Sequence, residues 1–128
     1  MIFDVSRFYE ILGENGLERF RSEKNYRDFM CLAASLEEFN SHTNITAIKD
    51  IEAVAVKHYA DSLCAEPLIA RGARVADIGC GGGFPSLPLA KVRNEIKLLL
   101  VDHLLFGGLK DGGKAVLTAN NAEFMIEI

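Results

Sequence analysis

Apolar residues recur at the spacing of an α-helix through the first third of the chain. Asp4 precedes the first run and is expected to cap a helix that ends at Gly13 and Gly16. A longer amphipathic helix is predicted over residues 22–40, where large apolar side chains recur at steps of three and four. Its apolar stripe consists of Tyr26, Phe29, Met30, Ala33, Leu36 and Phe39. We expect this stripe to pack in a core rather than to hold a cofactor.

The next segment is first polar and then helical again. Residues 41–46 carry polar side chains and are predicted to form a loop. Asp50 is expected to cap a short helix that reaches about Lys57. A further helix is predicted over residues 61–70, with Pro67 marking either an interruption or a restart, because proline has no backbone N–H to donate. Together these elements predict an N-terminal helical subdomain over residues 1–72.

The pattern changes at Arg74, where helical spacing gives way to short continuous apolar runs. The predicted order is a strand at 75–78, a glycine turn at 79–83, a helix at 86–92 and a second strand at 96–101. Ser86 is the expected N-cap of that helix. Continuous apolar runs are typical of parallel strands buried on both faces. This order is half of a nucleotide-binding βαβ unit.

Two more segments follow in the C-terminal part. A strand is predicted over residues 114–119, and residues 124–128 form either another strand or a simple end. Residues 73–128 are therefore predicted to form a second, partial α/β domain. Ordinary element lengths leave room there for about three strands and one or two helices, fewer than a complete doubly wound sheet needs.

Composition and charge narrow the classes of function. Of the 128 residues, 49% are hydrophobic and 25% are charged, which predicts a folded globule. The net charge of −4 argues against nucleic-acid binding through a broadly basic surface. Residues 1–66 carry seven basic and twelve acidic side chains, so the acidic excess lies in the helical half. A local basic patch is still compatible, with Lys91, Arg93 and Lys97 as its candidates.

Cysteines and apolar stretches indicate the compartment. The chain has three cysteines and no Cys-x-x-Cys pair, so we expect neither a disulfide framework nor a structural zinc site. We see no signal-peptide pattern at the N-terminus. No apolar stretch approaches the roughly 18 residues of a membrane-spanning helix. The expected location is the cytoplasm.

The glycine turn carries the most specific chemistry. Glycines allow a positive φ and let a ligand approach the backbone without meeting a Cβ atom. The spacing Gly79-x-Gly81-x-Gly83 is tighter than the dinucleotide fingerprint, which has its third glycine where this chain has Phe84. This spacing favours S-adenosylmethionine over NAD or FAD. Asp77 is the acid that precedes such turns, and either holds the loop through backbone N–H groups or meets the ligand's ammonium.

A second acid follows the second predicted strand. Asp102 is placed to accept both hydroxyls of an adenosine ribose. The alternative is a glycine-rich turn with a solvent-facing Asp102 and no ligand. Cys80 lies within the turn, and we expect it to pack rather than to act as a nucleophile.

Three motifs resemble one known family. The segment Asp77-Ile-Gly-Cys-Gly-Gly-Gly-Phe-Pro-Ser-Leu-Pro-Leu-Ala90 is similar to the glycine motif of the RsmG (GidB) methyltransferases. Residues 44–48 (Asn-Ile-Thr-Ala-Ile) and 57–63 (Lys-His-Tyr-Ala-Asp-Ser-Leu) resemble two further family segments in the same order. The likeness covers about residues 20–102.

The resemblance implies both an activity and a set of site residues. Family members methylate N7 of a guanine in 16S rRNA of the small ribosomal subunit, with S-adenosylmethionine as methyl donor. They have a Rossmann-like class I fold with an N-terminal helical cap. Gly79 and Phe84 would contact the cofactor and Asp102 the ribose, whereas Asn44, His58 and Asp61 match motif positions near the site. Guanine N7 carries a lone pair and no proton, so no general base is required.

After Asp102 the sequence departs from the family. The basic helix and further strand–helix units expected there are replaced by a short segment that resembles a late part of the family fold. The chain is then a shortened protein, a fragment, or a sequence with segments left out, and a shortened chain is expected to catalyse weakly or not at all. Two alternatives stay open: a noncatalytic family remnant used as a binding or structural domain, and a piece of an NAD-linked oxidoreductase.

Overall fold

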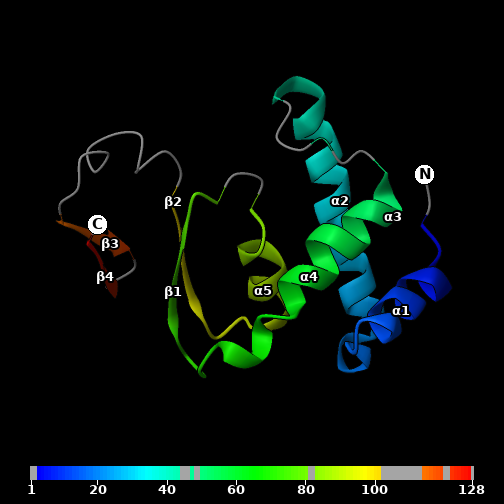
Figure 1. Cartoon of the computed structure of the whole chain (residues 1–128), viewed down its shortest axis with the longest axis horizontal. Coiled ribbons are helices and arrows are strands. Elements are labelled where there is room, and N and C mark those ends of the chain that lie inside the picture. Colours follow the sequence, from blue (N-terminus) through cyan, green and yellow to red (C-terminus); the bar gives the residue numbers. More distant parts are fainter. Residues whose placement is uncertain are drawn as a thin grey trace.

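Helices form one part of the molecule and short strands the other (Figure 1). The computed structural model describes residues 3–43, 47, 50–80, 83–101, 114–119 and 122–127. In chain order the elements are α1 (Val5–Glu14), η1 (Glu18–Phe20), α2 (Glu23–Thr43), α3 (Ile51–Val54), η2 (Ala55–Ala60), α4 (Asp61–Leu63), η3 (Glu66–Leu68), β1 (Arg74–Ile78), α5 (Ser86–Val92), β2 (Lys97–Val101), β3 (Lys114–Ala119) and β4 (Ala122–Glu127).

The first two helices begin where the sequence predicts. The Asp4 side chain accepts a hydrogen bond from the Ser6 backbone N–H (3.0 Å), which confirms it as the N-cap of α1. Helix α2 is longer than predicted, because it continues through Ser41 to Thr43. The Ser41 hydroxyl donates to the Glu38 carbonyl (2.6 Å), a bond that a serine can make inside a helix. The predicted loop is therefore wrong for residues 41–43.

Residues 51–63 form one continuous helical segment where two helices were predicted. Asp50 caps it as expected, accepting from the Glu52 N–H (3.2 Å). The middle of the segment, η2, has a wider π-helical turn that bridges the predicted break. The helix then ends at Leu63, and Pro67 lies in the short 3₁₀ turn η3. A helix over residues 61–70 is thus wrong beyond Leu63.

An aromatic cluster forms the core of the helical part. The ring of Phe8 stacks on Phe29 (centroids 5.2 Å apart, 17° between planes), and Tyr59 meets Phe29 edge-on (5.1 Å, 64°). The buried core comprises Phe3, Phe8, Ile11, Leu12, Leu17, Phe20, Phe29, Ala33, Leu36, Val54, Ala55, Tyr59, Ala60 and Leu63. The predicted packing role of the α2 stripe is confirmed for its described side chains, and the Phe39 side chain lies outside them.

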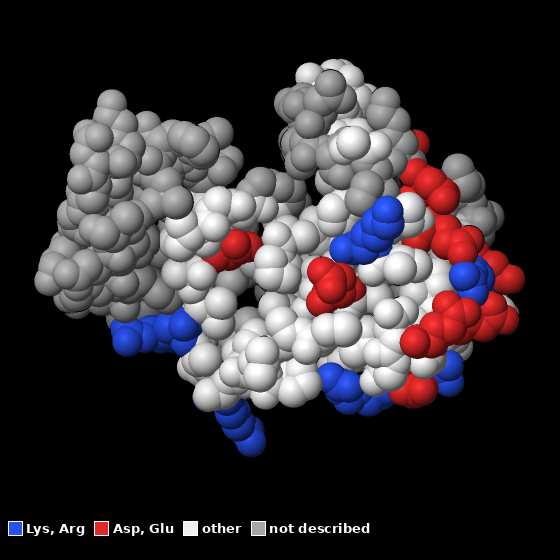
Figure 2. Space-filling model, viewed as in Figure 1, with Lys and Arg blue, Asp and Glu red and all other residues white. Residues whose placement is uncertain are grey.

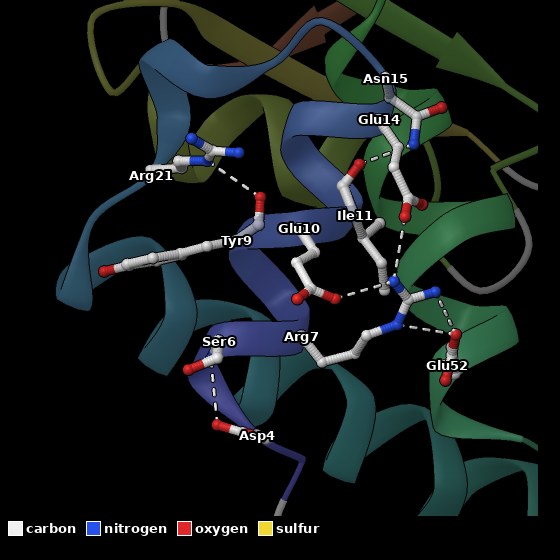
Figure 3. Close-up of polar contacts among 10 residues, drawn as sticks. All are labelled: Asp4, Ser6, Arg7, Tyr9, Glu10, Ile11, Glu14, Asn15, Arg21 and Glu52. Atoms are coloured by element: carbon white, nitrogen blue, oxygen red, sulfur yellow. Dashed lines mark hydrogen bonds and ion pairs between the residues drawn. The ribbon is translucent and has the colours of Figure 1, made fainter.

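Charged side chains gather at the outer edge of the helical part, over α1 and α3 (Figure 2). Arg7 is the centre of this network: it donates to Glu52 through Nε (3.0 Å) and Nη2 (2.5 Å). Its Nη1 donates to Glu10 (3.2 Å) and Glu14 (3.1 Å), so three carboxylates surround one guanidinium (Figure 3). Exposed ion pairs contribute little individually. The pair with Glu52 nevertheless joins α1 to α3 across a long sequence separation.

The predicted strand–helix–strand unit is confirmed. Strands β1 and β2 pair in parallel, from Arg74 opposite Lys97 to Ile78 opposite Val101, and α5 lies between this sheet and α4 (Figure 1). The expected burial on both faces is wrong for these two strands. None of their side chains is fully buried, and Ile78 and Leu100 are 36% and 42% exposed. A pair of strands has few neighbours to cover it.

Strands β3 and β4 form a separate antiparallel sheet of two strands. The strand predicted over residues 114–119 is confirmed with the same bounds. The open choice for the tail is settled in favour of a strand, which runs over Ala122–Glu127.

Arg93, at the end of α5, joins the sheet unit to the helical part. Its Nη1 donates to Glu66 (2.9 Å) and to the Ile69 carbonyl (3.1 Å), and its Nε donates to Glu95 (2.5 Å). The hydrogen bond from Arg93 lowers the pKa of the Glu95 carboxyl. The Arg93 guanidinium is therefore occupied by bonds within the protein. The sequence had suggested Arg93 as part of a basic patch for RNA, and these bonds argue against that role.

No helix within the described ranges is both long and apolar enough to cross a membrane.

A pair of leucines tests how much the helical core contributes to stability. Leu12 is fully buried and Leu68 is 87% exposed, so the same truncation removes packing at only one of them. We expect Leu12→Ala to lower the free energy of unfolding by about 2–5 kcal/mol. Leu68→Ala should change it by less than about 0.5 kcal/mol. Urea unfolding followed by circular dichroism measures both, and equal losses would contradict this assignment of the core.

Candidate functional site

At Gly79 and Gly83, the turn after β1 has the backbone that glycine predicts. Gly79 and Gly83 have φ values of +77° and +88°, in the left-handed region that other residues rarely adopt. The Gly79 N–H donates to the Val101 carbonyl (2.6 Å), which continues the parallel ladder past the end of β1. The Gly83 N–H donates to the Cys80 carbonyl (2.8 Å) and closes the turn.

The two glycines differ in what surrounds them. A Cβ atom built on Gly79 would meet no heavy atom of the described residues beyond its two chain neighbours within 4 Å, so these residues leave this side of the backbone open to an approaching molecule. A Cβ atom on Gly83 would lie 2.4 Å from Cδ1 and 2.8 Å from Cγ of Leu87. Gly83 is therefore required both by its backbone angle and by close packing, whereas Gly79 leaves space.

Asp77, near the end of β1, is hydrogen-bonded to Ser86, the first residue of α5. The Ser86 hydroxyl donates to Oδ2 of Asp77 (2.5 Å), and Ser86 is only 2% exposed. The expectation that Ser86 caps α5 is wrong: Pro85 occupies the N-cap position, and the Ser86 side chain turns toward β1. Sequence reasoning missed this pair because a serine at a helix start is usually read as a cap.

The turn also contacts the helical part through two rings. His58 of η2 stacks on Phe84, with centroids 4.9 Å apart and 27° between the planes. Phe84 additionally packs against the buried core of the helical part. Two sequence motifs that are separate along the chain, at residues 57–63 and 77–90, therefore meet in space.

Asp61 follows His58 by three residues in the same helical segment. It is exposed at the start of α4 and lines an open depression of about 420 Å³ on the helical part. The other lining residues are Asn15, Val56, Lys57 and Cys64. Asn44, Gly81 and Asp102, which the sequence also places in the site, lie outside the described residues.

Within the described residues, no three His, Cys, Asp or Glu side chains come together in a group that could hold a metal ion. Cys80 is partly buried in the turn. What the described residues bring together is a carboxylate, an open stretch of backbone and an aromatic surface, a set suited to an organic ligand with a cationic group.

The sequence that carries these motifs matches a known family. Residues 25–105 correspond to the GidB family, rRNA small subunit methyltransferase G. The chain belongs to this family. A ribosomal RNA small subunit methyltransferase G from Geotalea uraniireducens is 39% identical over 75 residues, which are 59% of this chain and 34% of the relative.

Two further relatives share the same name. The one from Desulfitobacterium hafniense is 38% identical over 98 residues, covering 74% of this chain and 41% of the relative. The one from Halalkalibacterium halodurans is 37% identical over 103 residues, covering 79% and 42%. The chain thus spans about two fifths of the length of the curated relatives it matches. The matched part contains the glycine turn and the helical segment that carries His58.

The contact between Gly83 and Leu87 gives a test of the turn. Alanine at Gly79 or Gly83 should cost about 1–2 kcal/mol through its positive φ. Gly83→Ala should cost more than Gly79→Ala, because only its new Cβ meets the Leu87 side chain. Adding Leu87→Ala to Gly83→Ala should recover that difference, with Leu87→Ala alone as the control. Unfolding free energies that are simply additive would contradict the contact.

Proposed function

We propose that this chain binds S-adenosylmethionine at the turn between β1 and α5, as the cofactor-binding part of an rRNA methyltransferase. The proposed target is N7 of a guanine in 16S rRNA, the substrate that the family resemblance implies. Support comes from membership of the GidB family and from the open backbone at Gly79 beside the Asp77 carboxylate. The geometry at Gly79 is the single observation that carries the proposal.

The described residues fit this cofactor. The space at Gly79 lets a ligand lie against the backbone without meeting a Cβ atom. Asp77 can accept a hydrogen bond from an ammonium group, and Phe84 offers a ring beside the same turn. Gly81 and Asp102 are carried over from the family motif, with Asp102 expected to accept the ribose hydroxyls. Bound S-adenosylmethionine would supply an electrophilic methyl group on a sulfonium.

The chain's own residues then have a positioning task. N7 of guanine has a free lone pair and no proton, so no side chain of the chain has to remove one. The turn and the helical part have to hold the cofactor and the base in line and keep water away. We place Asn44, His58 and Asp61 on the substrate side of this arrangement.

The proposal extends to the architecture. We assign residues 1–72 to a helical subdomain and residues 73–128 to a partial Rossmann-like domain of the class I methyltransferases. The parallel β1–α5–β2 unit supports this assignment. The partner would be 16S rRNA or the small ribosomal subunit, and the expected location is the cytoplasm.

A second candidate function rests on the open sheet. The exposed apolar side chains of Ile78 and Leu100 leave the described β1–β2 sheet incompletely covered. This favours a noncatalytic family member that retains the helices and a partial sheet for binding or structural purposes. The two candidates differ in one property, because only the first requires affinity for S-adenosylmethionine.

Titration calorimetry with S-adenosylmethionine, with NAD as the control ligand, separates these functions. We expect the chain to bind S-adenosylmethionine and not NAD. Binding of neither ligand would favour the noncatalytic candidate, and selective binding of NAD would indicate an oxidoreductase. Methyl transfer to isolated small ribosomal subunits, measured with radiolabelled S-adenosylmethionine, then tests whether the bound cofactor is used.

A matched pair of glycines tests whether the open backbone is the binding site. Gly16 has a φ of +69°, and a Cβ atom added to it would meet nothing within 4 Å, as at Gly79, but it lies after α1. In both alanine variants, the strained φ should lower the free energy of unfolding by about 1–2 kcal/mol. Only Gly79→Ala should weaken S-adenosylmethionine binding, by about tenfold or more, because its methyl group enters the ligand's space. Equal effects on binding would remove Gly79 from the site.

Two substitutions at His58 separate stacking from polar chemistry. His58→Phe keeps an aromatic ring against Phe84, and His58→Ala removes it. If the stack holds Phe84 in place, the Ala variant should bind S-adenosylmethionine several-fold more weakly and the Phe variant normally. Calorimetry measures both variants. Equal weakening in the two would show instead that His58 acts through its ring nitrogens.

A further inference from the structure

We propose that Ser86 is a positioning residue for cofactor binding and acts through Asp77. Its buried hydroxyl holds one oxygen of the Asp77 carboxylate, so that the other oxygen is directed to the amino group of bound S-adenosylmethionine. The inference rests on the proposed function. It assigns a task to a side chain that neither the sequence motif nor the family match singles out.

The contact between the two side chains is short and sheltered. The Oγ of Ser86 lies 2.5 Å from Oδ2 of Asp77, the length of a hydrogen bond to a charged acceptor. Ser86 is 2% exposed, whereas Asp77 is only partly buried. The Ser86 hydroxyl therefore donates from a buried position to a carboxylate that is itself partly accessible to solvent.

Ser86 has no better acceptor among the described residues around it. The Gly83 carbonyl is 3.5 Å from its Oγ, at the limit of a hydrogen bond, and that carbonyl already accepts the Leu87 N–H at 2.7 Å. A buried hydroxyl needs a partner, so the bond to Asp77 is strongly favoured. The same bond links the end of β1 to the start of α5 across the glycine turn.

Within the described residues, the Asp77 carboxylate has one oxygen left for a ligand. Among the described residues, Ser86 is the one side chain that bonds its carboxylate, and Oδ1 receives no hydrogen bond from them. A carboxylate tied at one oxygen cannot rotate freely. Its remaining oxygen is thus held in one direction before a ligand arrives, which lowers the cost of binding an ammonium group.

The ligand portion that this oxygen would recognise is the α-ammonium of the methionine moiety. A comparison of two ligands tests this contact. S-Adenosylmethionine carries the amino-acid portion on a charged sulfonium, and 5′-methylthioadenosine has the same nucleoside with an uncharged thioether and no amino-acid portion. An effect through Asp77 changes the affinity for the first ligand and spares the second, whereas a collapsed turn weakens both.

The test is calorimetry on the full chain with both ligands. We expect Ser86→Ala to weaken S-adenosylmethionine binding about fivefold to tenfold, as loss of an orienting charged hydrogen bond would. Its affinity for 5′-methylthioadenosine should stay within about twofold. Ser86→Thr, which keeps the hydroxyl, should restore most of the loss. In an Asp77→Asn background, Ser86→Ala should have little further effect on the ratio of the two affinities.

Ser62→Ala is the matched control. Ser62 is 5% exposed and its hydroxyl donates to the His58 carbonyl, so this variant removes a buried hydroxyl that is bonded to a partner other than Asp77. It should leave the ratio of the two affinities unchanged. An unchanged ratio in Ser86→Ala would overturn the positioning role, whether both affinities fall or neither does. Failure of the unaltered chain to bind either ligand would instead overturn the proposed function.

Discussion

Two neighbouring side chains on η2 connect the helical part to the glycine turn. Tyr59 is buried in the aromatic core, and this burial raises the pKa of its phenol, with the Asp28 carboxylate acting in the same direction. The preceding residue, His58, stacks on Phe84. Because a helix fixes the angle between consecutive side chains, the packing of Tyr59 in the core determines where His58 meets the turn. The placement of the candidate site thus depends on the core of another part of the molecule.

The turn itself combines an open side with a closed side. Leu87 fills the space beside Gly83, while the described residues leave the space beside Gly79 free. The hydrogen bond between Ser86 and Asp77 spans the turn and links β1 to α5. The proposed site would need little rearrangement at Gly79, Gly83 and Asp77 when a ligand binds, because hydrogen bonds already hold these residues.

The parallel sheet depends on its surroundings more than the helices do. Helix α5 packs between the sheet and α4, and Arg93 ties the end of α5 to Glu66 and to a backbone carbonyl of the preceding segment. Ile78 and Leu100 are still partly exposed. The described part of the chain therefore does not fully bury the apolar side chains of these two strands. The match to the relative from Desulfitobacterium hafniense covers 41% of that relative's length.

Much of the local structure could be read from the residues themselves. The Asp4 and Asp50 caps, the α2 stripe and the positive φ values at the glycines follow from side-chain chemistry and spacing, which act over a few residues. The family motifs of the turn are equally local.

The predictions were wrong where residues distant in the sequence determine the structure. The π-helical turn that bridges a predicted break and the exposure of β1 and β2 both depend on which elements pack against them. The pairing of Ser86 with Asp77, the stack of His58 on Phe84 and the ion pair of Arg93 with Glu66 join residues from different elements. Only the tertiary structure decides such contacts, because spacing along a chain does not determine which side chains meet across it.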